Sequence, residues 1–290
     1  MSAATRTARS RPTRVGPSRV LAHAVLIAAA VYTLFPLVWL FTAVTKTTGD
    51  LYTTGMFEWN GFRLFDNLGA LFSESNGIYL HWYLNSVLYA GFGALIGAFL
   101  SVCAGYAFEK YSFAGKERLF GVVLLGVLIP TSALALPLYL LASATGVVNT
   151  FWAVLIPSIC NPFGVYLARI FARGYIPDEV LEAARVDGAG ELTTFFGISW
   201  RLMLPGFATI FLFQFIGIWN NFFLPLVMLS NQDLFPVSLG LYNWNSQVAL
   251  EPQFYTLVMV GAFVAIVPLI IVFILTQRFW RAGLTAGSLK

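Results

Sequence analysis

The charged side chains that are best placed to form specific interactions lie in one polar segment, residues 172–203, between two long apolar stretches. Pro177 suits the first turn of a helix, and the carboxylates of Asp178 and Glu179 stabilise the positive end of such a helix. Gly188 can adopt the left-handed backbone conformation that ends a helix, and a second helix is expected to start near Gly190. The segment therefore predicts a helix–glycine–helix element lying along a membrane face.

The polar groups of this element are able to form ion pairs. Glu182 and Asp187 can pair with basic groups of another protein, and the small Ala183 and Ala184 permit close backbone approach. The second helix is expected to carry a mostly apolar stripe at the helical spacing i, i+3, i+4, i+7, formed by Leu192, Phe195, Phe196 and Ser199. An ordinary pair of interfacial helices has the same pattern, so the residues alone leave both interpretations open.

Motifs for catalysis are missing from the sequence. It has no Gly-x-Ser-x-Gly elbow, no metal-ligand cluster and no Walker A loop, because Gly115-Lys116 is followed by Glu117 and lacks the earlier glycine. We therefore expect a non-enzymatic chain that binds no cofactor and no metal and hydrolyses no nucleotide itself. Cys103 and Cys160 lie in apolar stretches and are interpreted as small buried side chains.

Composition indicates an integral membrane protein. Of the 290 residues 58% are hydrophobic and only 10% are charged, far from the roughly 25% charged residues of soluble domains. Six uncharged stretches are long enough to be read as transmembrane helices, at residues 20–44, 82–108, 119–141, 151–168, 204–229 and 255–277. The predicted fold class is all-α integral membrane with six transmembrane helices, preceded by a basic N-terminal segment, residues 1–19.

Orientation follows from the basic residues. Of the 17 Lys and Arg residues, all but Lys46 and Arg63 fall in segments on the side of the N-terminus. Cytoplasmic loops are enriched in Lys and Arg, so both termini are predicted to be cytoplasmic. The same distribution argues against binding of nucleic acid, because the basic residues flank spans as topology alone requires.

Small residues and prolines predict how the spans pack. Gly93, Gly97, Ser101 and Gly105 recur every four residues, which places them on one stripe where another backbone can approach closely. Prolines that should kink helices occur in five of the spans, at Pro36, Pro130, Pro137, Pro157, Pro162, Pro225 and Pro268. A kinked helix exposes carbonyl groups that lipid does not satisfy, so the spans are expected to bundle around one another or around a cavity.

The polar segment carries a family resemblance. Glu182-Ala183-Ala184, Asp187-Gly188-Ala189 and Ile198 resemble the EAA loop of bacterial ABC-importer membrane subunits of the carbohydrate-uptake group, typified by the smaller permease of the maltose transporter. The resemblance extends over most of the chain and implies a type I ABC importer (MetI-like) permease fold over residues 20–290. This chain has Trp200-Arg201 where the family commonly has Leu-Pro, so the turn into the fifth span is expected to differ in detail.

The resemblance implies a mechanism and partners. A chain of this family pairs with a second permease subunit in the bacterial inner membrane, with two ABC ATPase subunits that bind ATP and Mg, and with an extracytoplasmic sugar-binding protein. It implies coupling to the ATPase through Glu182, Ala183, Ala184, Arg185, Asp187 and Gly188. It also implies that a C-terminal tail contacts the ATPase, formed by Gly283, Leu284, Thr285, Ala286 and Gly287.

The path of the substrate is less well determined. A neutral sugar needs hydrogen-bonding and aromatic groups without charge, and apart from His23 the spans hold no ionisable acid or base such as ion-driven carriers place at mid-membrane. The candidates are Asn161, Gln214, Trp219, Asn220, Asn221, Thr131 and Ser132. Helix packing explains any one of them at least as well. The alternative function is a stand-alone carrier or a channel for a small neutral solute, although Asn161-Pro162-Phe163 is only one imperfect copy of the paired aquaporin motif.

Overall fold

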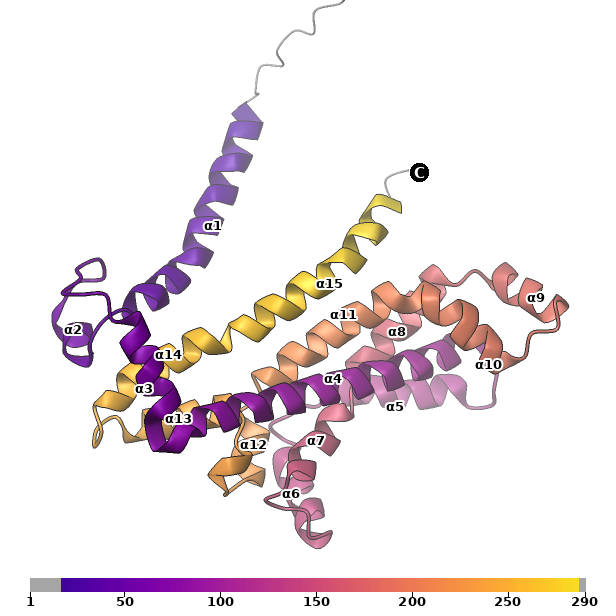
Figure 1. Cartoon of the computed structure of the whole chain (residues 1–290). Coiled ribbons are helices and arrows are strands. Elements are labelled where there is room, and N and C mark those ends of the chain that lie inside the picture. Colours follow the sequence, from indigo (N-terminus) through magenta and orange to yellow (C-terminus); the bar gives the residue numbers. More distant parts are fainter. Residues whose placement is uncertain (1–16, 287–290) are drawn as a thin grey trace, which may run out of the picture.

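The computed structural model describes residues 17–286 and is built from helices, with no strand in that range (Figure 1). Its α-helices are α1 (Pro17–Ala43), α2 (Thr48–Thr53), α3 (Leu64–Ser73), α4 (Ile78–Lys110), α5 (Lys116–Leu128), α6 (Ala135–Ala144), α7 (Phe151–Ile159), α8 (Pro162–Tyr175), α9 (Asp178–Val186), α10 (Glu191–Thr194), α11 (Trp200–Trp219), α12 (Phe223–Met228), α13 (Val237–Gln247), α14 (Gln253–Ala265) and α15 (Val267–Ala286). Two short 3-10 turns, η1 (Glu74–Gly77) and η3 (Gln232–Leu234), and one π turn, η2 (Phe195–Ser199), complete the described part.

Five helical stretches in the described residues are long and apolar enough to cross a membrane: 19–43, 64–110, 151–175, 191–219 and 253–279. They correspond to five of the six predicted spans. The expected single helix over 119–141 is wrong, because the chain leaves the helix at Ile129 and resumes it only at Ala135. Pro130 explains the interruption, since a proline disfavours the helical conformation of the residue before it.

The other prolines differ in effect, and Pro36 and Pro157 lie inside continuous helices. The fourth stretch is divided into α7 and α8 just before Pro162, and Asn161 takes a non-helical conformation there. The predicted span 204–229 ends earlier than expected, at Trp219, and α12 follows as a separate helix. Trp200-Arg201 does not form a turn: the π turn η2 continues directly into α11, and the Trp200 ring packs 5.5 Å from Phe99 and 5.2 Å from Phe207.

The central helix is α4, and its stripe of small residues confirms the predicted packing. A Cβ atom at Gly97 would lie 2.6 Å from the carbonyl oxygen of Ile159, and one at Gly105 would lie 2.6 Å from the amide nitrogen of Arg169. Larger side chains would push α7 and α8 away, so these glycines determine how closely the helices approach.

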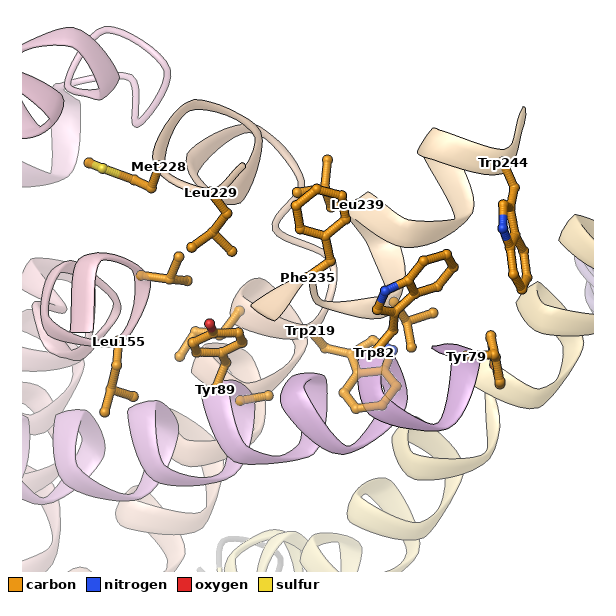
Figure 2. Packing of buried hydrophobic residues seen from close by; sticks show 14 of the residues in the cluster. Tyr79, Trp82, Tyr89, Leu155, Trp219, Met228, Leu229, Phe235, Leu239 and Trp244 are labelled. Carbon is orange, nitrogen blue, oxygen red and sulfur yellow. The ribbon is translucent and has the colours of Figure 1, made fainter. Parts of the chain in front are cut away.

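The two ends of the bundle differ in construction (Figure 1). One end, here called the loop end, carries α9 and α10; the other, the cap end, carries α2, α3 and α13. At the cap end, residues 232–237 are fixed to α4, since Trp82 Nε1 donates to the Gln232 carbonyl at 2.9 Å and Ser86 Oγ accepts from the Val237 amide at 2.8 Å. Aromatic side chains from several elements fill the core there, among them Trp82, Trp219 and Trp244 (Figure 2).

Helix α1 projects away from the rest of the bundle (Figure 1). Residues 19–39 are all exposed in this chain, and burial begins only at Thr42. The contact of α1 with the bundle is made near its C-terminal end, where the Phe41 and Phe263 rings lie 6.1 Å apart. An apolar helix of this length is stable when lipid or another apolar surface covers it.

Candidate functional site

The helix–glycine–helix element is formed as predicted. Helix α9 begins after Pro177, carries Asp178 and Glu179 in its first turn and ends at Val186. Gly188 has a φ of +76°, and the Ala189 amide donates to the Ala184 carbonyl at 2.9 Å, which is the bond that closes a helix with a left-handed residue. Gly190 then precedes α10. The chain reverses at Gly188 because glycine adopts this conformation without strain.

The outward surface of α9 differs in part from the expectation. Glu182, Ala183, Arg185 and Asp187 are exposed, but Ala184 is only 5% exposed and packs toward the bundle with Leu181. Ala184 is therefore not available for close approach of a partner, because the rotation of α9 turns it inward. The sequence interpretation also missed Val186, an apolar residue that is 87% exposed beside the acidic groups.

The expected apolar stripe of the second helix is split. Phe195 and Ser199 are buried, whereas Leu192 is 75% exposed and Phe196 is 53% exposed. The π turn over 195–199 changes the residue spacing per turn, so positions that share a stripe in a regular α-helix point in different directions. Val186, Leu192 and Phe196 are thus large apolar side chains left uncovered at the loop end.

Two neighbouring residues at the end of α4 hold the element from both sides. Lys110 Nζ donates to the Ile176 carbonyl and to Asp178 Oδ1, each at 2.6 Å. Tyr111 donates its hydroxyl to Glu191 Oε2 at 2.9 Å. Burial, followed by this hydrogen bond, raises the pKa of Tyr111, so its hydroxyl remains a donor at neutral pH. The element is therefore attached to α4 at the start of α9 and at the start of α10.

An ion network that the sequence analysis did not identify lies beside these contacts. Glu109 accepts from Arg169 Nε at 3.2 Å and from Arg173 Nε at 2.8 Å, and Arg169 also donates to Glu117 at 2.7 Å. The hydrogen bonds from Arg169 hold the pKa of the Glu117 carboxyl below its usual range. Arg169 and Arg173 are one helical turn apart on α8, a spacing that could have indicated a shared partner.

The candidate path residues do not form one site. The Asn161 Nδ2 donates to Gln214 Oε1 at 2.9 Å, and Gln214 Nε2 donates to the Ser158 carbonyl at 2.9 Å. Gln214 is 8% exposed and Asn161 is half-buried, and their amides bond to each other at the break between α7 and α8. Trp219 is 5% exposed and belongs to the aromatic core of the cap end.

The other path candidates lie at helix interruptions. Asn220 is exposed after α11, and Asn221 Oδ1 accepts from the Leu224 amide at 3.3 Å. Thr131 and Ser132 are exposed in the break between α5 and α6. The two pairs of residues therefore belong to two different interruptions of the helical chain. The uncharged groups that remain open to solvent are therefore Asn220, Thr131 and Ser132.

The expected tail lies at the limit of the structure. Residues 283–286 form the end of α15, and Gly287 lies outside the described residues. Within residues 17–286, no group of three or more His, Cys, Asp or Glu side chains could hold a metal ion.

Together these features define a helical, multi-span membrane protein with a polar helix–glycine–helix element at one end. Residues 93–282 match the family described as binding-protein-dependent transport system inner membrane component, and the chain belongs to that family. The predicted resemblance of this chain to the membrane subunits of bacterial ABC importers is thereby confirmed. Such permeases are the non-catalytic membrane components of their transporters, located in the inner membrane of bacteria.

Relatives agree in length as well as sequence. The chain is 36% identical to the arabinooligosaccharides transport system permease protein AraQ of Halalkalibacterium halodurans, over 88% of this chain and 91% of the relative. It is 32% identical to the lactose transport system permease protein LacG of Rhizobium radiobacter, over 93% and 96%. A chain of a bacterial ABC transporter that imports the acidic polysaccharide alginate has the same fold, with a TM-score of 0.78, 23% identity and coverage of 92% of this chain and 99% of that one.

Proposed function

We propose that this chain forms half of the translocation path of an ATP-driven importer for a neutral di- or oligosaccharide. The observation that carries the proposal is the exposed helix–glycine–helix element, which is attached to the spans yet presents Glu182, Val186 and Asp187 outward. Such a surface suits a basic, partly apolar cleft on an ATPase. Nucleotide-driven closure of the ATPase then moves the element, and the spans follow by alternating access.

The substrate class rests on two independent supports. The relatives named above carry arabinooligosaccharides and lactose by their names, and both are neutral carbohydrates. The open polar residues of the span breaks, Asn220, Thr131 and Ser132, are uncharged hydrogen-bonding groups that suit sugar hydroxyls.

The proposed assembly contains a second permease subunit, two ATPase subunits and an extracytoplasmic binding protein. ATP and Mg bind to the ATPase subunits, and this chain supplies the docking residues Glu182, Ala183, Arg185, Asp187 and Gly188. Residues 283–287 are proposed to reach the ATPase pair, and the cap end faces the binding protein. Lipid covers the remaining apolar surface.

Reconstitution separates this function from that of a stand-alone carrier. Liposomes that hold this chain with its second permease and ATPase are expected to take up sugar when ATP is inside and the loaded binding protein is outside. Liposomes with this chain alone are expected to take up none. Uptake by the chain alone would contradict the proposal and would favour the carrier. Mass analysis of the ligand retained by the binding protein identifies the sugar.

We further propose six crossings with both termini cytoplasmic, the broken pair α5 and α6 providing the third. The asymmetry of the basic residues supports this topology. In a background without Cys103 and Cys160, single cysteines at the exposed positions Asn60, Glu179 and Ser246 test it. An impermeant thiol reagent added to intact cells is expected to label positions 60 and 246 but not 179. Labelling of position 179 from outside would contradict this topology and would indicate the inverted one.

A further inference from the structure

The last residues of α4 and the first residue after it contact α8, the start of α9 and the start of α10. Glu109 pairs with Arg169 and Arg173 on α8, Lys110 contacts the joint between α8 and α9, and Tyr111 contacts α10. These three consecutive residues are here called the clasp. Because the three residues are consecutive, a displacement of α9 relative to α8 changes contacts that all lie at the same end of α4.

Burial makes the Lys110 contact strong. The Lys110 side chain is 7% exposed, and its ammonium group donates both to a backbone carbonyl and to the carboxylate of Asp178. Charge-assisted hydrogen bonds are roughly twice as strong as neutral ones, and a buried ammonium without them would be costly. Tyr111 is fixed in turn by Tyr106, with the rings 5.6 Å apart and perpendicular. The element therefore cannot leave α4 without breaking several bonds together.

We propose that Lys110 and Tyr111 are positioning residues that transmit the motion of the helix–glycine–helix element to α4. The inference rests on the proposed coupling function and names the residues on this chain through which the coupling passes. Helix α4 suits the task, since its 33 residues run from the loop end to the cap end, where Trp82, Asn85 and Ser86 hold residues 232–237. A displacement of the clasp is therefore transmitted to residues 232–237 through one continuous helix.

The docking surface itself does not include the clasp. Glu182, Val186 and Asp187 lie on the exposed side of α9, whereas Lys110 approaches α9 from the bundle side. Removing the clasp contacts should leave binding of the ATPase intact and should disconnect it from the spans. This separates a positioning role from a docking role.

The test uses the complete transporter with the double variant Lys110→Met and Tyr111→Phe. Methionine keeps the unbranched apolar stem of lysine, and phenylalanine keeps the ring that packs on Tyr106. We expect the ATPase to co-purify in normal amount, and we expect sugar transported per ATP hydrolysed to fall by about tenfold, which corresponds to about 1.4 kcal/mol of lost coupling. The separate variant Lys110→Arg, which retains the charge and the donors, should keep most of the original ratio of sugar transported to ATP hydrolysed.

Arg118→Met is the matched control, because it removes a positive charge from the same end of the molecule. Arg118 is exposed, and no ion pair of its side chain occurs within residues 17–286. It should leave the ratio within twofold. Should the double variant fail to fold, Tyr111→Phe alone, which deletes one hydroxyl, is expected to lower the ratio severalfold.

An unchanged ratio of transport to hydrolysis in a folded clasp variant would overturn the proposal. That result would leave the proposed coupling role of the helix–glycine–helix element standing, provided that Gly188→Val still abolished uptake. Normal uptake in Gly188→Val would instead contradict the proposed function itself. The two failures are therefore distinguishable.

Discussion

Replacing Gly188 with valine is expected to abolish most ATPase association and sugar uptake while the chain still inserts into the membrane in normal amount. Gly188 has a φ of +76°, a conformation that costs a β-branched residue about 1–2 kcal/mol or more. No atom lies within 4 Å of a Cβ at this position, so the effect comes from the backbone alone. The α9 helix would extend or tilt, and its acidic side chains would miss the partner cleft. Co-purification of the ATPase and uptake into vesicles measure the loss.

Gly190→Val is the matched control for that change. Gly190 is two residues away, its φ is −70°, and a Cβ there would also meet no atom within 4 Å. Valine adopts this conformation without strain, so ATPase association and uptake should stay close to the original values. Equal loss in both variants would show that any bulk in this turn is harmful, and the left-handed conformation would then not be the cause.

Gly105→Ala is expected to cause a large loss of stability from a single methyl group. The added Cβ would lie 2.6 Å from the Arg169 amide nitrogen and 2.7 Å from the Ala168 carbonyl carbon. These are backbone atoms, so no rotamer change relieves the contact, and α4 must separate from α8. Overpacking of this kind costs about 2–3 kcal/mol. The separation also strains the ion pairs between Glu109 and Arg169 one turn further along.

Gly91→Ala makes the same chemical change in the same helix without the contact. No atom lies within 4 Å of a Cβ at Gly91, and alanine favours helix over glycine. Thermal unfolding in detergent, followed by size-exclusion chromatography, should show a clearly lower midpoint for Gly105→Ala and no decrease for Gly91→Ala. A similar midpoint for both variants would contradict the close packing of α4 on α8.

Local features of the sequence were predictable where one residue type decides the outcome. The turn at Gly188 and the close approach at Gly97 and Gly105 follow from glycine itself, because no other residue fits a positive φ or a backbone contact so readily. Composition also predicted five stretches at which the structure has helices long and apolar enough to cross a membrane.

Features that depend on rotation and on distant partners were not predictable. Ala183 and Ala184 are chemically identical, and only the tertiary position of α9 decides that Ala184 faces inward. In the sequence, Arg169 and Arg173 were explained by the enrichment of basic residues in cytoplasmic segments. That rule applies equally well whether or not the two side chains pair with Glu109, so it did not reveal the ion pairs. Among the path candidates, Gln214 donates hydrogen bonds to the Ser158 and Ile159 carbonyl groups beside the helix break before Pro162. The position of Gln214 next to these carbonyl groups is evident only from the tertiary structure.

The isolation of α1 has a consequence for biosynthesis. One of its contacts with the bundle, between Phe41 and Phe263, joins residues separated by about 220 positions of chain. At about 5–20 residues per second, the ribosome needs about 10 s or more to make that interval. During this time residues 19–39 of α1, which are all exposed, must remain in the bilayer without support from the rest of the chain. Its composition permits this, since even the Thr33 hydroxyl donates within the helix, to the Ala29 carbonyl at 2.8 Å. The first helix is therefore an independent insertion unit, and the rest of the bundle assembles after it.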